Sequence, residues 1–215
     1  SNSFMGYQAG FGNTSGIGNL FLGYQSGFAN GTGNYNTFVG YLTGKSNSAG
    51  TGNSFLGSYS GIANTTGNGN SFIGNYAGYT NTNGSFNSFV GFEAGYSNNS
   101  SYNSFIGYRT GYNTTTGGYN VFIGYQSGYN EVGSNKLYVS NSNTSNPLIY
   151  GEFDNSVLRI NGDLYLNGIS DSANTHVLYY NNVTSRITYG LQPNATEMIE
   201  DYITDVFPVG IKGNT

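Results

Sequence analysis

The only histidine of the chain, His176, lies close in sequence to Asp171 and Ser172, and these residue types together can support nucleophilic catalysis. A Ser/His/Asp triad is defined by its geometry, so proximity along the chain is weak evidence for one. The three residues lie in a turn that leads into an expected β-hairpin, where polar side chains are normally solvated. We therefore expect a structural role for them, and we expect that the chain is not an enzyme.

Glu152, Asp154 and Asp163 come closest to a metal site or a pair of catalytic carboxylates. The Asp-x-Asn-x-Asn-Gly spacing of a calcium-binding loop is absent, so structural turns are the preferred interpretation. The spacing of Gly6 and Gly10 does not indicate a phosphate-binding loop, because no Lys-Ser/Thr pair follows it. We expect no catalytic residue, no metal and no cofactor.

Binding through uncharged side chains is the remaining possibility. Tyr and Asn recur in regular rows, and aromatic rings with neighbouring amides can stack on and hydrogen-bond to carbohydrate. Residues that depart from the repeat are the better candidates for specificity, because a stacked ladder requires the same residue in every coil, whereas a specific binding site requires residues that differ from those of the other coils. The alternative for each of them is drift in a tolerant repeat. The candidate surface-binding residues are Lys45, Ser58, Asn75, Glu93, Tyr108 and Arg109.

Most of these residues belong to a unit that occurs eight times. The copies are 17 residues apart except for one interval of 16, and they begin at Asn2, Asn19, Asn36, Asn53, Asn70, Asn87, Asn103 and Asn120. Counted from this Asn, position 4 is aliphatic or Met, and positions 5 and 9 are always Gly. Position 3 is always Phe, which gives Phe4, Phe21, Phe38, Phe55, Phe72, Phe89, Phe105 and Phe122. A fixed short period of this kind decides the fold class.

A unit this short and this rich in Gly and Asn does not predict helices. We expect one strand at positions 2–6, a second at positions 8–12, and turns between them. Each copy is then one coil of an all-β, parallel β-solenoid (β-roll), and eight coils stacked at about 4.8 Å span about 38 Å. Stacking in register predicts a ladder of Phe and a ladder of Asn side chains.

The two faces of the first strand are both apolar. Position 3 shares a face with position 5, whereas the aliphatic position 4 shares the other face with position 6, which is Tyr or Phe in six copies. A thin solenoid has one interior and covers only one of these faces. We infer that the second face packs against other copies of the chain. The alternative is that the aromatic residues at position 6 lie on the surface.

The amino-acid composition excludes several classes of protein. Charged residues make up 7% of the chain, far below the roughly 25% of ordinary globular proteins. Clustered Lys and Arg are absent, so we expect no nucleic-acid partner, and no apolar run reaches bilayer length, so we expect no membrane insertion within this segment. An uncharged surface of Asn, Ser, Thr and Tyr suits an extracellular rod. The first residue already adjoins the first repeat, and we expect the chain to be part of something longer.

The repeat ends after Tyr129, and we divide the chain into a repeat array (1–134), a β-rich cap or neck (135–170) and the start of a further module (171–215). The neck is expected to contain strands at Lys136–Val139, Pro147–Phe153 and Val157–Leu166. The last segment is expected to form a hairpin over His176–Tyr189 and a short helix over Ala195–Phe207, in which Asn194 is the cap.

These residues also show a family resemblance. Asn-Ser-Phe-Ile-Gly-Tyr at Asn103–Tyr108 resembles the head repeats of trimeric autotransporter adhesins (YadA-like). It looks still more like the Asn-Thr-Phe-x-Gly-Tyr-x-Ala-Gly arrays of tail-fibre-like proteins in bacteriophages and Bacteroidetes, and Asn146–Leu164 resembles segments that follow such arrays. The resemblance implies a homotrimer of left-handed parallel β-rolls that presents a receptor-binding surface.

The sequence thus predicts a homotrimeric fibre or adhesin segment at a cell surface or in a virion fibre, which attaches to a host-cell receptor or glycan. A passive spacer that carries a binding domain elsewhere is the alternative. An ice-binding solenoid is less favoured because it needs a regular row of Thr, whereas the Thr and Ser positions of this chain are irregular. A polysaccharide depolymerase is least favoured because the array lacks paired acids.

Overall fold

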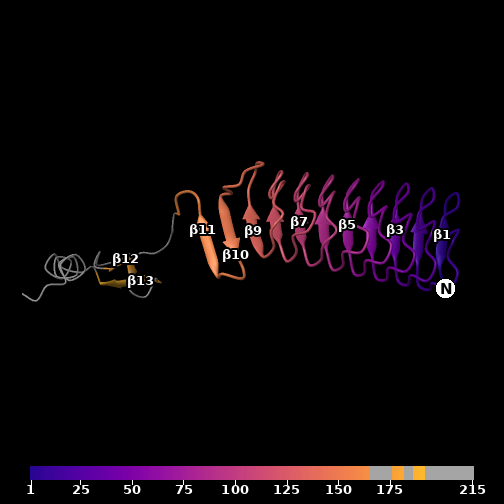
Figure 1. The fold of residues 1–215 in the computed structure, drawn as a ribbon, viewed down its shortest axis with the longest axis horizontal. Helices are drawn as coiled ribbons and strands as arrows, with labels where there is room; N and C mark the ends of the chain where they lie inside the picture. Colours follow the sequence, from indigo (N-terminus) through magenta and orange to yellow (C-terminus); the bar gives the residue numbers. More distant parts are fainter. Residues whose placement is uncertain (165–175, 182–185, 192–215) are drawn as a thin grey trace, which may run out of the picture. The chain divides into compact units, whose positions relative to one another are not determined.

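A computed structural model describes residues 1–164 and, as backbone alone, the strands at residues 176–181 and 186–191 (Figure 1). The chain separates into two compact units, Ser1–Leu164 and Tyr165–Thr215. Each unit is described by itself.

The first unit is a single sheet of eleven strands in sequence order (Figure 1). Successive strands pair in parallel from β1 to β9, and the register places each Phe of position 3 directly opposite the next one. The expected all-β solenoid of eight coils is confirmed. The strands are β1 Ser3–Met5, β2 Leu20–Leu22, β3 Thr37–Val39, β4 Ser54–Leu56, β5 Ser71–Ile73, β6 Ser88–Val90, β7 Ser104–Ile106, β8 Val121–Ile123, β9 Lys136–Val139, β10 Ile149–Glu152 and β11 Val157–Ile160.

Each coil contains one strand of three residues, so the prediction of a second strand at positions 8–12 is wrong. The strand ends at position 4 because the Gly at position 5 has φ between 115° and 141°. Positions 6–11 then form consecutive turns, as when Asn30 N–H donates to the carbonyl of Gly27 at 3.0 Å. Backbone hydrogen bonds between coils continue through these turns, for example from Gly27 N–H to the carbonyl of Thr43 at 2.9 Å. The coils are therefore held together on every side without a second sheet.

Phenylalanine and asparagine fill the interior. From Phe21 to Phe122 the Phe side chains of position 3 are 0–1% exposed, and neighbouring rings stack with centroids 4.7–5.0 Å apart. The expected Phe ladder is confirmed, and its spacing equals the strand spacing of a β-sheet. A small residue at position 8, such as Ser26 or Thr43, lies buried in each coil from the second onward. This small residue leaves room for the ring within the narrow coil.

Two Asn ladders complete the interior, one at position 1 and one at position 12, whereas only a single Asn ladder was expected. Asn36 represents the first: its N–H donates to Oδ1 of Asn19 at 2.9 Å, and its Nδ2 donates to the carbonyl of Gly50 at 2.8 Å. Asn47 represents the second: its Nδ2 donates to Oδ1 of Asn30 at 2.7 Å. Amides of the first ladder thus satisfy backbone groups of their own coil and of the next one, whereas amides of the second bond to the backbone of their own coil and to one another between coils, as buried polar groups require.

Glycine at position 5 is dictated by the stacking. A Cβ on Gly74 would lie 2.3 Å from the carbonyl oxygen of Gly91 in the next coil, and its φ of 139° is accessible to Gly alone. The backbones of neighbouring coils therefore approach closely at this position.

The coil of 16 residues interrupts the second Asn ladder. Asn98 lies in this coil and donates to the carbonyl of Thr114 at 2.9 Å instead of to Asn81. Within residues 1–164, Asn81 Oδ1 and Asn103 Nδ2 are buried without a hydrogen-bond partner. The first ladder continues through the short coil, since Asn103 N–H donates to Oδ1 of Asn87 at 2.9 Å.

Beyond the array, β10 pairs antiparallel with β9 and with β11, which are joined to the same sheet. All three strands were expected, but the last two are shorter than the predicted Pro147–Phe153 and Val157–Leu166, of which residues 165–166 lie outside the described residues. Hydrogen bonds from Tyr150 and Asn155, then the ammonium of Lys136, lower the pKa of Glu152 to about 2. This cluster joins the ends of β9 and β10.

In the second unit, β12 (His176–Asn181) pairs antiparallel with β13 (Arg186–Leu191), from His176 opposite Leu191 to Asn181 opposite Arg186. The hairpin predicted over His176–Tyr189 is confirmed. The helix predicted over Ala195–Phe207 lies outside the described residues. No helix occurs in the part of the chain that the structure describes, and so none there is long and apolar enough to cross a membrane.

Candidate binding surface

The outer face of the strands carries one aliphatic residue or Met per coil, exposed except at the half-buried Val39 and Val90, and we call this row the aliphatic stripe. Period-2 alternation turns position 4 outward wherever position 3 faces the interior. Leu56 is 50% exposed and Ile106 is 47% exposed, whereas the Phe residues beside them are buried. At the strand spacing the stripe is about 34 Å long. Its members are Met5, Leu22, Val39, Leu56, Ile73, Val90, Ile106 and Ile123.

Charge is almost absent around the stripe. Lys45, Glu93 and Arg109 are the only charged side chains between residues 2 and 130. At the end of the stripe, an open hollow of about 620 Å³ lies beside Ile123, Val139 and other residues of the cap. The stripe therefore presents an uncharged apolar face that continues past the last coil.

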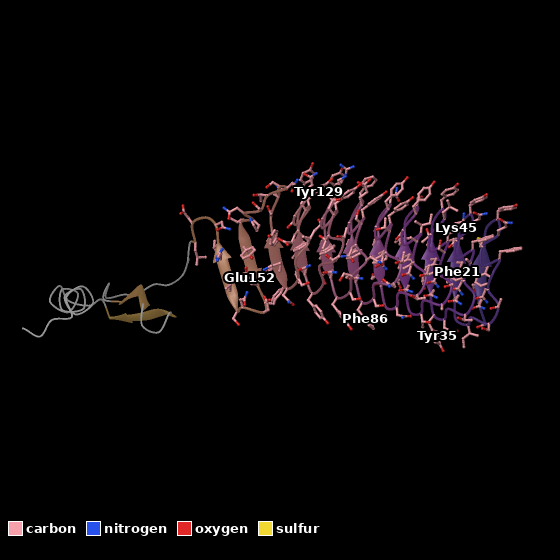
Figure 2. All side chains as sticks on the ribbon, in the orientation of Figure 1. Phe21, Tyr35, Lys45, Phe86, Tyr129 and Glu152 are labelled. Carbon is pink, nitrogen blue, oxygen red and sulfur yellow. The ribbon has the colours of Figure 1, made fainter. Side chains whose placement is uncertain are left out.

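Aromatic rings form three further rows. We call two of them the first and second aromatic columns, and the third stacks Phe86, Tyr102 and Tyr119 with centroids 4.7–5.4 Å apart. The first column has one ring per coil at position 6 or 7, with neighbouring centroids 4.9–6.1 Å apart. The second column lies at position 10 and contains a stack of Tyr79, Tyr96, Tyr112 and Tyr129, with centroids 4.8–5.0 Å apart. Figure 2 shows Lys45 and Tyr129 of this row on one long edge of the solenoid, with Tyr35 and Phe86 on the opposite edge.

Stacking changes what the columns can bind. Neighbouring rings of the four-Tyr stack are within 10° of parallel, so the inner rings lie face to face with a ring on each side. A sugar that stacks on an aromatic ring needs an open face. Within a stack only ring edges and hydroxyl groups face the solvent, and burial raises the pKa of Tyr96 and Tyr112, so these hydroxyls stay protonated. An open face is available only where a stack ends.

Ser58 and Asn75 are explained by the first column. In their two coils the ring moves from position 6 to position 7, as Tyr59 and Tyr76, which stack at 4.9 Å. Oδ1 of Asn75 accepts a hydrogen bond from the N–H of Ser58 at 3.1 Å. The side chain of Asn75 thus supports the neighbouring coil, although it remains exposed.

Glu93, Tyr108 and Arg109 are brought together by stacking of the sixth and seventh coils. Glu93 and Arg109 both occupy position 7, and their Nε–Oε2 distance is 2.5 Å. The guanidinium carbon lies 5.2 Å from the ring centre of Tyr108 and 5.5 Å from that of Tyr112. The hydrogen bond to Glu93 raises the pKa of Arg109, and the two charges neutralise each other. The pair bridges the two aromatic columns instead of offering a free charge.

Lys45 lies apart from this group in the third coil. It replaces the aromatic ring of position 10, and its ammonium lies 6.0 Å from the ring centre of Phe28. The structure therefore assembles three of the predicted surface-binding residues into one cluster and leaves Lys45 separate.

A pocket of about 320 Å³, which we call the terminal pocket, opens where the second column ends. Glu131 is fixed beneath it, because its two carboxylate oxygens accept hydrogen bonds from Gly133 N–H and from the Tyr138 hydroxyl, each at 2.6 Å. Burial and the hydrogen bond to Glu131 raise the pKa of Tyr138, so this hydroxyl remains a donor. This pocket was not predicted from the sequence. The available signal was Glu131, an acid at position 12 of the last coil, two residues after the last ring of position 10. The pocket is lined by Gly128, Tyr129, Asn130, Glu131, Tyr138, Asn143, Thr144 and Ser145.

The residues considered for catalysis do not form a described site. Asp171 and Ser172 lie outside the described residues, and only the backbone of His176 is described. Glu152 is engaged in the β9–β10 cluster, whereas Asp154 and Asp163 are exposed. No group of three potential metal ligands occurs among the residues whose positions are described.

Comparison of the chain with protein-family models, with curated proteins and with solved structures gives no significant match.

Proposed function

We propose that the chain is a segment of a self-associating extracellular fibre that attaches to a cell surface. The observation that carries this proposal is the aliphatic stripe. Soluble monomers rarely expose contiguous apolar patches larger than a few hundred Å². Here every coil of the array contributes one aliphatic side chain to the same line, and no charge interrupts it.

Another copy of the chain is the best-matched cover for this stripe. Its own stripe has the same spacing, the same length and the same absence of charge, so rows from different copies can interdigitate over their whole length. Homo-oligomers commonly use such repeated, self-complementary surfaces. We propose a homotrimer, in agreement with the arrangement that the family resemblance implies.

The oligomeric state tests the proposal directly. Sedimentation velocity or mass photometry of the purified chain should give a trimer, and the double variant Leu56→Asn/Ile73→Asn should give smaller species with an unchanged far-UV circular dichroism spectrum. Tyr35→Asn is the matched control, because Tyr35 is 65% exposed but lies in another row. A wild-type monomer, or a double variant that remains trimeric, would refute self-association through the stripe.

Attachment requires its own measurement. A multivalent display of the chain on beads should bind host cells or arrayed glycans above the level of uncoated beads, and failure at every density would contradict the attachment role.

A passive shaft is the second candidate, and the stacking of the aromatic columns favours it for the inner coils. Rings that face one another contribute stiffness and leave few open faces for a ligand. Deletion of two complete inner coils distinguishes the roles: a shaft keeps the attachment activity of the whole fibre, whereas inner coils that carry the binding site lose it.

A further inference from the structure

The second aromatic column ends with one ring face directed towards open space. Tyr129 stacks on Tyr112 with centroids 5.0 Å apart and 5° between the ring planes. The parallel pairing of β8 with β9 ends at Val139, and no aromatic residue occurs between Ser140 and Leu148. Ser145 of this segment lines the terminal pocket. Within residues 1–164 no further ring stacks on Tyr129, and the pocket occupies the place of the missing rung.

Polar groups surround this ring face. The carboxylate of Glu131 accepts one hydrogen bond on each oxygen, which leaves acceptor capacity on both. Oδ1 of Asn130 accepts a hydrogen bond from Asn113 at 2.8 Å, so the orientation of this amide is fixed with its NH₂ group as a donor. Asn143 and Ser145 add an exposed amide and an exposed hydroxyl. The pocket thus offers an aromatic face, a fixed acceptor and several donors.

The lining also excludes other classes of ligand. No Lys or Arg lines the pocket, so an anionic ligand would meet an uncompensated carboxylate. A single carboxylate is a weak basis for a divalent cation, which prefers several anionic oxygens. A purely apolar ligand would leave the carboxylate and amides without partners, which is unfavourable. The ligand that fits is a neutral ring with C–H groups on one face and hydroxyl groups around its edge.

We propose that the terminal pocket binds a neutral hexopyranose unit, which stacks on Tyr129 as the next rung of the column and donates a hydroxyl hydrogen bond to Glu131. Ring C–H groups carry partial positive charge and suit the negative face of the Tyr ring. A volume of about 320 Å³ is at the lower end of the range for ligand pockets, which suits one or two sugar rings. This inference deepens the attachment role and, as a statement about biological use, rests on it.

Saturation-transfer NMR with the full chain tests the proposal. The probes are the methyl glycosides of glucose, galactose, mannose and N-acetylglucosamine, with N-acetylneuraminic acid as the anionic probe and Ca²⁺ as the cationic probe. We expect at least one neutral probe to receive saturation and to bind more than tenfold more weakly to Tyr129→Ala. Tyr79→Ala is the matched control, since Tyr79 is at the other end of the same four-ring stack, and it should leave the affinity unchanged.

Ser145→Tyr places a large side chain at the exposed lining of the pocket and should abolish sugar binding without destabilising the fold, which separates loss of the pocket from loss of folding. The proposal is overturned if no neutral probe binds, if Tyr129→Ala and Ser145→Tyr both keep the wild-type affinity, or if only the anionic or the cationic probe binds. A trimer that attaches to cells but ignores every neutral probe would refute the pocket and retain the fibre. A monomer that binds a neutral probe would support the pocket and refute the self-associating fibre.

Discussion

Replacement of Asn53 by Ala tests whether the buried amides are structural rungs. Oδ1 of Asn53 accepts the N–H of Asn70 at 2.9 Å, and its Nδ2 donates to the carbonyl of Gly67 at 2.8 Å. The carbonyl of Gly67 keeps a second hydrogen bond, from Asn64 Nδ2 at 3.2 Å, whereas the N–H of Asn70 loses its acceptor. An unsatisfied buried group costs about 1–3 kcal/mol, and the lost bond to Gly67 adds about 1 kcal/mol. We expect the free energy of unfolding to fall by about 2–4 kcal/mol.

Guanidinium titration followed by far-UV circular dichroism measures this change, at one fixed protein concentration. Amide hydrogen exchange at Asn70 locates it, which is important because solenoid stability is approximately a sum over neighbouring repeats. Asn68→Ala is the control: Asn68 is exposed, although it also makes hydrogen bonds, and its replacement should change stability by less than about 0.5 kcal/mol. If Asn53→Ala is no more destabilising than Asn68→Ala, the ladder is not a stabilising element and the reasoning fails.

Three further outcomes follow from the same geometry. Gly74→Ala should lower the free energy of unfolding by about 2–6 kcal/mol, because the new Cβ meets the carbonyl of Gly91 at 2.3 Å in a strained backbone conformation. The stability that Glu152 contributes is present above its unfolded pKa of 4.5 and should be lost as the pH falls from about 4.5 to about 2, its pKa in the folded state; thermal unfolding across this range measures the loss. Glu93→Gln should cost no more than about 1 kcal/mol at low salt and almost nothing in 1 M NaCl, since its pair with Arg109 is partly exposed.

Matched variants make these outcomes decisive. Gly52→Ala is the control for Gly74, because its Cβ would meet nothing within 4 Å, and it should cost only about 1–2 kcal/mol. Equal losses for the two glycines would contradict the steric argument. Glu152→Gln should flatten the acid dependence of the melting temperature, and an unchanged slope would show that other carboxylates cause it. A salt-independent loss in Glu93→Gln would show that the pair acts through packing.

The eight coils, their register and the buried Phe ladder could be predicted from sequence because each depends on identity at a fixed period. The outward direction of Leu56 and Ile73 followed from period-2 alternation in the same way. The second strand could not be predicted correctly. Positions 8–12 contain residues that strands tolerate. Position 7, however, adopts a positive φ, for example 48° in Gln25, and the residue types found at position 7 do not indicate this.

The terminal pocket was missed for a different reason. Its wall comes from Tyr129 and Glu131 of the last coil, but also from Asn143 and Ser145, which lie in an irregular loop beyond β9. The pairing of β8 with β9 ends at Val139, so the repeat does not specify the path of this loop. The repeat allows the structure of each further coil to be predicted, whereas the structure at the end of the array depends on residues that do not repeat.

The ring shift at Tyr59 and Tyr76 shows that the first aromatic column is maintained as a unit. When position 6 becomes Ser58 and then Asn75, a Tyr occurs at position 7 of the same coil, and the contacts continue at 5.3 Å to Tyr41. Independent surface rings would not require this compensation. Where neighbouring rings stack face to face they cover one another, so a stiff shaft and an aromatic binding site compete for the same rings; Tyr59 and Phe92 instead meet Tyr41 and Tyr76 edge-on. Of the described rings at which a stack in either aromatic column ends, Tyr129 is the one that lines a pocket, and this is the physical reason for placing ligand recognition at Tyr129 and self-association along the aliphatic stripe.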